Sequence, residues 1–389
     1  MLSSRFVRLT RGLRRNRIRK QVKYSKITVV GFEKVQQLVR ANHGVMITAN
    51  HSAHYDSEAL YCGLDQFQQP IFIVTAWQIF GGLSWWKRYL LQGMGCFSIN
   101  REGSDRNAFK ESVRVLREEP YPLLIFPEGD IYHTNDRITS FREGMSAIAM
   151  SAARHGERPI SIVPCGIKFW YMEDPRPSLR QVLTNMENRL LLHPAEKWTL
   201  VMRIHRLANA AISLKEIEFM GHLTREELPC RANRLIDFIL KRLEERHGSP
   251  RTDEYIPERV KTLRQLVIKK IDEGEALAER ADEALLRRYR LDMDDLFTVM
   301  QLYSYPGDYL DGNPSIERIA ETIDKLEEDI TFAELPTVHG RKHVQVRFGD
   351  PIEVTSNRSR DLVTVLANQA RDGVQAMIDQ INRERASLD

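Results

Sequence analysis

Short apolar runs recur along the first 170 residues, and each ends in polar residues, glycine or proline. They lie at residues 27–30, 45–49, 70–75, 123–126 and 160–167 and are short enough to be strands. Helical patterns separate them. Strands that alternate with helices predict an α/β fold with a mostly parallel or mixed sheet flanked by helices. We expect a functional site where the strands end, because polar residues gather there.

The composition is that of a soluble globular protein. The chain has 389 residues, of which 42% are hydrophobic and 28% charged, enough for about two or three domains. No apolar segment approaches the ~20 residues that span a bilayer, so any membrane contact is expected from one side. The four cysteines form no C-x-x-C pair and indicate neither a zinc knuckle nor a disulfide framework. We interpret Cys96 and Cys165 as core residues in a reducing compartment.

The first 26 residues hold ten Lys or Arg and no acid, although the whole chain nets only +4. If residues 2–13 are helical, an apolar stripe lies beside the arginines, and it consists of Leu2, Phe6, Leu9 and Leu13. We predict that residues 1–26 contact an anionic membrane, at the cytoplasmic inner face. A transit peptide, a nucleic-acid arm and a solvated tail are the alternatives. Our interpretation includes no nucleic-acid partner.

His51 follows the run at residues 45–49, and Asp56 lies five residues further along. Within one helix such a pair is rotated by roughly 140°, so we expect His51 in the turn before a helix and Asp56 in its first turn. Ser52 is the expected N-cap. Asp56 can then hold one imidazole nitrogen and leave the other as a general base. The alternative is that the pair merely caps a helix, and His54 leaves the choice of base open.

Other strand ends carry residues suited to an anionic ligand. Within residues 95–103, Phe97 and Ile99 alternate with small or polar residues as in a half-buried strand, and Arg101 emerges at its end with a fork of donors. Glu128 and Gly129 follow Pro127, and glycine lets a ligand approach the backbone closely. The run at 160–167 is interrupted by a proline. The helix expected over residues 139–150 opens with Ser140 and Glu143 at capping-box spacing.

These segments resemble, in order, the four sequence blocks of the glycerolipid acyltransferase family, which includes the 1-acylglycerol-3-phosphate acyltransferases. The blocks are His51-x4-Asp56, Gly95-x-Phe97-x-Ile99-x-Arg101, Phe126-Pro127-Glu128-Gly129 and Val163-Pro164-x-Gly166. The resemblance covers roughly residues 27–170 and is far more specific as an ordered set than in any single block.

The resemblance implies a glycerol-3-phosphate acyltransferase-like core. It implies acyl transfer from acyl-CoA or acyl carrier protein, as co-substrate, to a lysophospholipid or glycerol phosphate-type hydroxyl, with no metal and no further cofactor. His51 would be the base and Asp56 its orienter. Arg101, Glu128 and Gly129 would bind the acceptor's polar head. Pro164 and Gly166 would belong to the acyl-donor side or to structural support.

One departure from the family concerns the third block. The family commonly continues Glu-Gly-Thr-Arg-Ser, whereas Asp130, Ile131 and Tyr132 follow Gly129 here. The second phosphate-binding arginine is therefore missing, and the acceptor need not be lysophosphatidate. Either Arg137 or Arg142 can take its place, or both are solvated.

Residues 81–91 are rich in aromatic side chains and include the adjacent cations Lys87 and Arg88. Tryptophan favours the headgroup level of a membrane, so this segment can form a surface where lipids or acyl chains enter. The alternative is that Trp85 and Trp86 both lie in the core.

Beyond Trp170 the resemblance thins. Residues 198–205 and 343–352 both look like the strand that closes the core, and the sequence leaves the choice open. We predict an acyltransferase core at residues 27–206, a helical accessory region or insertion at 207–334, and a core-closing strand with a C-terminal helix at 335–389.

Two other functions are possible for a chain with these features. One is a catalytically silent lipid-binding or scaffold protein on the same fold. The other is a metal-dependent hydrolase that uses His51, His54, Asp56 and His133, although His-x-x-His-x-Asp is not a common metal-binding arrangement. We favour the acyltransferase.

Overall fold

The computed structural model describes residues 2–100, 105–249, 255–275, 282–355 and 360–387. The chain divides into two compact units. We call Met1–Ser178, Ile316–Glu321 and Thr337–Asp389 the core unit, and Leu179–Ser315 with Thr322–Pro336 the helical unit. No helix within the described ranges is both long and apolar enough to cross a membrane.

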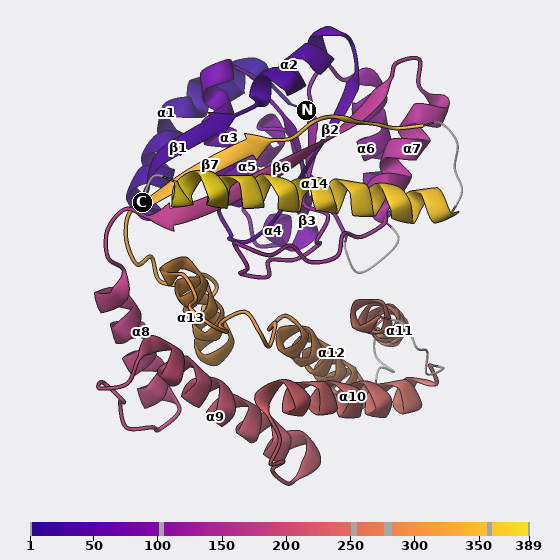
Figure 1. The fold of residues 1–389 in the computed structure, drawn as a ribbon. Helices are drawn as coiled ribbons and strands as arrows, with labels where there is room; N and C mark the ends of the chain where they lie inside the picture. Colours follow the sequence, from indigo (N-terminus) through magenta and orange to yellow (C-terminus); the bar gives the residue numbers. More distant parts are fainter. Residues whose placement is uncertain (1, 101–104, 250–254, 276–281, 356–359, 388–389) are drawn as a thin grey trace. The chain divides into compact units, whose positions relative to one another are not determined.

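The core unit is built on a sheet that has eight strands within the described residues, in the order β1-β7-β6-β2-β5-β3-β4, with β8 beside β6 (Figure 1). The strands are β1 (Tyr24–Val30), β2 (Gly44–Ala49), β3 (Phe72–Ala76), β4 (Cys96–Ile99), β5 (Leu123–Ile125), β6 (Ile160–Tyr171), β7 (Lys342–Phe348) and β8 (Ile352–Glu353). Strands β2 to β6 are mutually parallel, whereas β7 and β8 run antiparallel to β6. The predicted α/β class with a mostly parallel sheet is confirmed.

Helices cover both faces of this sheet. One face carries α6 (Arg106–Glu118), α7 (Gly144–His155) and α14 (Arg360–Ala386), which runs across the strands in Figure 1. Their buried side chains, such as Leu116, Ala149 and Val374, form one cluster with the sheet. The other face carries α1 (Ser4–Gln21), α2 (Phe32–Arg40) and α3 (Asp56–Leu64), followed by the short η1 (Asp65–Phe67). Helices α4 (Trp77–Gly81) and α5 (Trp85–Gly93) connect β3 to β4.

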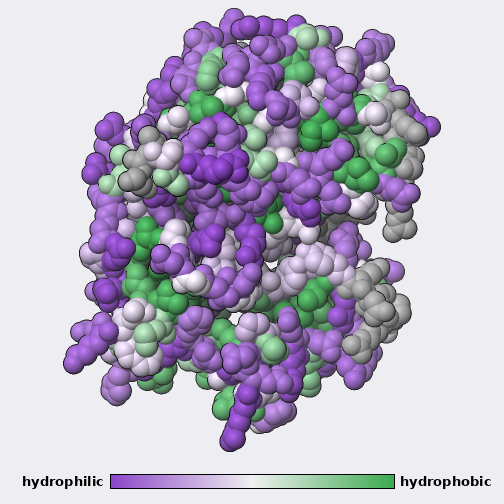
Figure 2. Space-filling model, viewed as in Figure 1, coloured by the Kyte–Doolittle hydropathy of each residue, from purple (hydrophilic) through white to green (hydrophobic). Residues whose placement is uncertain are grey.

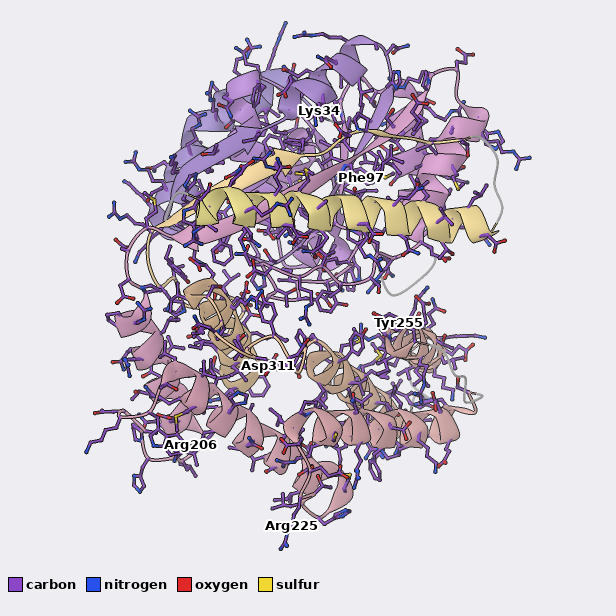
Figure 3. The ribbon with its side chains drawn as sticks, in the orientation of Figure 1. Lys34, Phe97, Arg206, Arg225, Tyr255 and Asp311 are labelled. Carbon is purple, nitrogen blue, oxygen red and sulfur yellow. The ribbon has the colours of Figure 1, made fainter. Side chains whose placement is uncertain are left out.

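Lys34 and Phe97, both labelled in Figure 3, make contacts within the core unit. Lys34 of α2 forms an ion pair with Asp350, in the turn after β7, at 2.8 Å. Phe97 of β4 is partly buried against the cluster formed by α6, α7 and α14. Hydrophilic residues make up most of the face of the molecule seen in Figure 2, with hydrophobic residues in small groups.

The expected interruption of β6 at Pro164 is wrong, because the strand continues to Tyr171. One edge of β6 pairs with β2, and the other edge changes partner from β8 to β7. Pro164 lies at this change, between the residues that pair with β8 and those that pair with β7. Its carbonyl accepts a hydrogen bond from Gly349 N at 2.8 Å. Proline is tolerated at this position because a backbone N–H there would have no strand residue to accept its hydrogen bond.

The helical unit contains most of α8 (Arg176–Arg189) and α13 (Ile316–Thr331), and all of α9 (Leu200–Met220), α10 (Leu228–His247), α11 (Ile256–Glu275) and α12 (Glu283–Tyr303). Leu240, Val267 and Leu296 are fully buried between α10, α11 and α12.

The alternative that residues 198–205 form a strand is wrong. Thr199 caps α9, its side chain accepting a hydrogen bond from Met202 N at 3.2 Å. Leu200, Ile204 and Leu207 then recur at helical spacing and are buried. The strand that joins the sheet is β7, which lies between β1 and β6.

A buried ion pair joins two helices of this unit and predicts an acid-sensitive stability. Glu216 of α9 accepts hydrogen bonds from Arg231 of α10 at 2.6 and 3.0 Å. These bonds from Arg231 lower the pKa of Glu216 from 4.5 to about 2. A carboxyl group whose pKa falls on folding stabilises the folded state above its unfolded pKa, and this stabilisation is lost as the pH falls through the folded value.

We predict that Glu216→Gln lowers the free energy of unfolding at neutral pH by about 3 kcal/mol, because Arg231 is left buried without its counter-charge. The variant is expected to lose less stability than the wild type as the pH falls from about 4.5 to about 2. Thermal melts across this range measure both effects. Lys215→Gln, which breaks an exposed pair with Glu218, is the control and should change little. Parallel acid limbs for wild type and Glu216→Gln would contradict the prediction.

Candidate active site

His51 lies in the turn between β2 and α3, at the edge where the parallel strands end. The turn brings Oδ2 of Asp56 to 3.2 Å from Nδ1 of His51. The same oxygen accepts a hydrogen bond from Ala53 N at 2.7 Å. The side chain of Asp56 is 2% exposed and that of His51 is 17% exposed. The structure thus places the buried carboxylate of Asp56 at Nδ1 of His51. Nε2 is the second ring nitrogen, the one that Asp56 does not contact.

The expected N-cap at Ser52 is wrong. Helix α3 begins at Asp56 with Tyr55 as its N-cap, and no side chain makes a capping bond. The carboxylate of Asp56 instead turns back to Ala53, so residues 53–55 form a turn and not the first helical turn. Within the described residues, the buried Oγ of Ser52 has no hydrogen-bond partner.

The loop after β5 forms hydrogen bonds with both the backbone N–H and the backbone carbonyl of His51. Glu128 Oε1 accepts a hydrogen bond from His51 N at 2.8 Å, and Tyr132 N donates to His51 O at 3.4 Å. The ring of Phe126 stacks on the imidazole with 4.2 Å between centroids and 23° between planes. Backbone and ring are therefore both fixed by a loop that is far away in sequence, because β5 is the sheet neighbour of β2.

Glu128 is buried, and both of its carboxylate oxygens bind the chain itself. Its second oxygen accepts hydrogen bonds from Thr139 N at 3.0 Å and from Thr139 Oγ1 at 2.6 Å. Burial raises the pKa of Glu128, and these bonds together with the one from His51 N oppose the rise. The geometry makes Glu128 a positioning residue for His51. The role in binding the acceptor's head that the resemblance implies stays a prediction.

The capping box expected at Ser140 and Glu143 is wrong, since α7 begins only at Gly144 and Glu143 makes no side-chain cap. Thr139 is held by Glu128, and Arg142 N donates to Pro127 O at 2.9 Å. These bonds keep residues 139–143 in the loop beside His51 and prevent the helix from starting earlier.

Gly129 and Arg142 are brought together in this loop. Gly129 has a φ of +79°, which favours glycine, and a Cβ there would overlap the Arg142 guanidinium group. The guanidinium group therefore lies directly on the backbone of Gly129. Arg142 is partly exposed, and within the described residues its side chain has no ion pair or hydrogen bond. A cation in this position is available to an anionic ligand.

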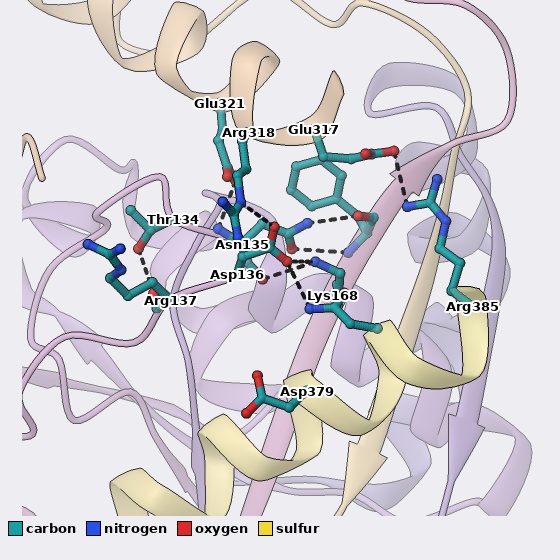
Figure 4. A network of polar contacts seen from close by, with 12 residues as sticks. Thr134, Asn135, Asp136, Arg137, Lys168, Glu317, Arg318, Glu321, Asp379 and Arg385 are labelled. Carbon is teal, nitrogen blue, oxygen red and sulfur yellow. Dashed lines mark hydrogen bonds and ion pairs between the residues drawn. The ribbon is translucent and has the colours of Figure 1, made fainter. Parts of the chain in front are cut away.

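The remaining residues predicted for the site are Arg101, Arg137, Pro164 and Gly166. Arg101 lies outside the described residues. Arg137 accepts a hydrogen bond from Thr134 Oγ1 through its carbonyl oxygen at 2.7 Å, and Figure 4 shows its side chain directed away from Lys168. Pro164 and Gly166 lie in β6 under α14, where a Cβ on Gly166 would come within 2.8 Å of Met377. These contacts favour structural support over an acyl-donor role for both residues.

Asn50 and Asn135 were missed by sequence reasoning. Beyond the end of β2, the amide of Asn50 makes two hydrogen bonds with the backbone of Ile167, at 2.9 and 2.7 Å. Asn135 pairs with Phe169 in the same way, at 2.8 and 3.1 Å. Each amide replaces a strand neighbour along β6 and so fixes the loops on either side of His51. The available signal is that Asn50 directly follows an apolar run.

A polar network anchors the loop that contains Asn135 (Figure 4). Asp136 binds Lys168 of β6, Arg318 of α13 and Asn382 of α14. Glu321 Oε2 accepts a hydrogen bond from Asn135 N at 2.8 Å. Hydrogen bonds and attraction from Lys168, Arg318 and Asn382 lower the pKa of Asp136 despite the opposing effect of burial, so this acid is charged and engaged.

The four residues of the alternative metal site do not share one cluster. Across the ranges that the structure describes, neither His51 nor Asp56 joins a set of three potential metal ligands, whereas His54 and His133 belong together to one. The rings of His54 and His133 lie edge to face at 5.7 Å. Cys165 is fully buried, as expected, and burial raises the pKa of its thiol well above the usual range. Cys96 is only partly buried, but burial also raises its pKa, to about 11.

Comparison with known proteins identifies a family for part of the chain. Residues 26–168 match the family model described as Acyltransferase, a range that contains His51, Asp56, Glu128, Gly129 and Arg142. No curated protein sequence matches the chain. Residues 26–168 thus form a domain of the acyltransferase family, the family of the glycerolipid acyltransferases, and this supports an acyltransferase activity for the chain.

Proposed function

We propose that this chain transfers an acyl group from acyl-CoA or acyl carrier protein to the hydroxyl of a lysophospholipid or glycerol phosphate-type acceptor. The observation that carries the proposal is the fixed imidazole of His51, with Asp56 at Nδ1 and the loop of Glu128 on its backbone. A base held in this way leaves Nε2 for a substrate hydroxyl.

His51 and Asp56 together can carry out the proton transfers of the acyl-transfer reaction. A hydroxyl group with a pKa of about 15 does not attack a thioester unaided, and a general base contributes roughly 10²- to 10⁴-fold. His51 Nε2 takes the hydroxyl proton as the oxygen attacks the thioester carbonyl carbon. The tetrahedral intermediate collapses with cleavage of the C–S bond, and the sulfur leaves with the proton from His51. Asp56 holds the Nδ1 proton throughout and stabilises the transient imidazolium ion.

Arg142 supplies the anion-binding group that the third block lacks. Its guanidinium group lies on Gly129, in the loop that carries Glu128, and is not engaged by another described residue. A phosphate on the acceptor can accept two parallel hydrogen bonds from such a group. The acceptor is therefore one that presents a phosphate near its hydroxyl.

We predict that Arg142→Ala raises KM for a phosphate-bearing acceptor by about 10- to 100-fold, the cost of a charged hydrogen bond, with little change in kcat. Steady-state kinetics with a varied acceptor measure this. The matched control is Arg154→Ala, which removes an exposed arginine near the end of α7. An unchanged KM for Arg142→Ala, or an equal effect of both variants, would remove Arg142 from the acceptor site.

The proposed function is tested by incubating the purified chain with mixed acyl-CoA, acyl carrier protein loaded with fatty acid, and a membrane lipid extract. Mass spectrometry should show a lipid that has gained one acyl group, together with an equal amount of free thiol. Formation of free fatty acid alone would indicate a hydrolase. No turnover with any donor would favour a catalytically silent lipid-binding protein.

A further inference from the structure

The connection between β3 and β4 exposes large apolar side chains to solvent. Neither α4 nor α5 contains a buried residue. Trp85 is 81% exposed and Tyr89 is 71% exposed. Trp77, Ile79 and Trp86 are also exposed. The alternative that Trp85 and Trp86 lie in the core is wrong, because α5 packs beside β4 with both of these side chains exposed, Trp85 at 81% and Trp86 at 48%.

Helix α1 extends this surface. Its packing face consists of the buried Val7 and Ile18, with Arg14 paired to Asp65 at 2.6 Å. Leu9 and Leu13 are 81% and 73% exposed. Of the apolar stripe seen in the sequence, Leu9 and Leu13 therefore do not pack on the core unit, whereas Leu2 is partly buried against its core.

Helix α1 meets α5 at its N-terminal end. Ser3 N donates to Gly93 O at 3.0 Å, and a Cβ on Gly93 would lie 3.0 Å from the ring of Phe6. Phe6, Leu9 and Leu13 are spaced by three and four residues, so they share one side of α1. Leu9 and Leu13 therefore lie on the side of α1 that faces α5.

The charge of these segments is entirely positive. Residues 1–26 and 77–95 contain no Asp or Glu. Arg5 and Arg8 are exposed and have no ion-pair partner among the described residues. Lys87 lies over the ring of Trp86, with 5.5 Å from its Nζ to the ring centroid. Aromatic rings beside cations suit the headgroup region of an anionic bilayer, whereas a second copy of this surface would be repelled.

The topology places one end of this surface beside the candidate active site. Helix α4 begins directly after β3, and β3 is separated from β2 by β5 alone. Because these three strands are parallel, Trp77 of α4 follows the sheet at the same edge as His51. A bilayer in contact with α4 would present its lipids at that edge.

We propose that the aromatic-basic surface, formed by Trp77, Ile79, Trp85, Trp86, Lys87 and Tyr89 of α4 and α5 with Arg5, Arg8, Leu9 and Leu13 of α1, docks the core unit on an anionic lipid bilayer. This inference deepens the proposed function, on which its purpose rests, by naming the surface from which a lipid acceptor is drawn. Rings at the headgroup level contribute apolar contact, and the cations of α1 contribute attraction to anionic lipids.

Sedimentation of the full chain with phosphatidylcholine vesicles, with and without phosphatidylglycerol, tests the proposal. The wild type should sediment with the anionic vesicles. The triple variant Trp85→Ser, Trp86→Ser, Tyr89→Ser should bind them roughly tenfold or more weakly. Arg5→Gln with Arg8→Gln should weaken binding only to the anionic vesicles. The control is Leu191→Ser, which removes a leucine that is 93% exposed in the helical unit and should bind like the wild type.

Three further measurements keep the test decisive. Circular dichroism establishes that the triple variant is folded. Vesicle binding by His51→Ala should equal that of the wild type, so docking stands even if the proposed chemistry fails. Wild-type binding by the triple variant, or failure of the wild type to bind anionic vesicles, would overturn the proposal. So would a dimer of the wild type in lipid-free sedimentation velocity that the triple variant lacks, since the surface would then belong to a second copy.

Discussion

Replacement of His51 by alanine is expected to lower kcat for acyl transfer by about 10²- to 10⁴-fold, the contribution of a general base. The substitution removes Nε2, the nitrogen that takes the hydroxyl proton. It leaves the backbone N–H and carbonyl of residue 51, which bind Glu128 and Tyr132, so the loop should keep its position. Initial rates with saturating donor and acceptor measure the loss, and a thermal melt establishes that the variant is folded.

His54→Ala is the matched control for this measurement. His54 lies three residues further along the same turn, is partly buried and packs against His133. The sequence leaves the choice of base between the two histidines open, and the structure places Asp56 at one nitrogen of His51. Retained activity in His54→Ala with loss in His51→Ala assigns the base. The reverse pattern would assign it to His54.

Asp56→Asn is expected to reduce kcat by a similar factor, about 10²- to 10⁴-fold, through the orientation of the imidazole. Because Oδ2 of Asp56 contacts both Ala53 N and Nδ1 of His51, one atom of the asparagine amide must face both groups. An oxygen there keeps both hydrogen bonds but lacks the charge that stabilises the imidazolium ion. An NH2 group there loses the bond from Ala53 N and donates to Nδ1, which favours the tautomer that carries its proton on Nε2. In that tautomer Nε2 cannot accept the proton of the hydroxyl group.

Asp65→Asn serves as the control for Asp56→Asn. Asp65 follows the other end of α3 and binds Arg14 of α1, so its substitution should affect stability but not kcat. Near wild-type kcat in Asp56→Asn would contradict the orienting role. A loss that disappears when rates are corrected for the folded fraction would contradict it as well.

The parts of the site that are close in sequence could be predicted, and the parts that depend on sheet order could not. His51 and Asp56 are five residues apart, so the turn alone brings them together. Contact between Glu128 and His51 requires β5 to lie next to β2, although β3 and β4 come between them in the chain. The order of the strands in the sheet cannot be read from any periodicity in the sequence.

The starts of the two helices nearest the site were predicted too early, for one physical reason. Ser52 and Ser140 both have the residue type of an N-cap, but tertiary hydrogen bonds hold the chain in loops at both places. Asp56 binds Ala53 in the first loop, and Glu128 binds Thr139 in the second. Local propensity is overridden where the loop is part of the site.

The position of β7 in the sheet and the exposure of α5 could not be predicted from the sequence either. Strand β7 enters between β1 and β6 from the far end of the chain, and residues 343–352 gave only one of two equal candidates for that position. The tryptophans of α5 have the composition of a core segment. The structure shows instead that α5 contains no buried residue and that Trp85 is 81% exposed.

The most direct test of the account is the rate of free-thiol release from acyl-CoA, measured with and without a lysophospholipid acceptor, for the wild type and for His51→Ala. The account predicts release by the wild type that depends on the acceptor and matches the ester formed, with at least about 10²-fold less for folded His51→Ala. Equal acceptor-dependent release by the two proteins would contradict it.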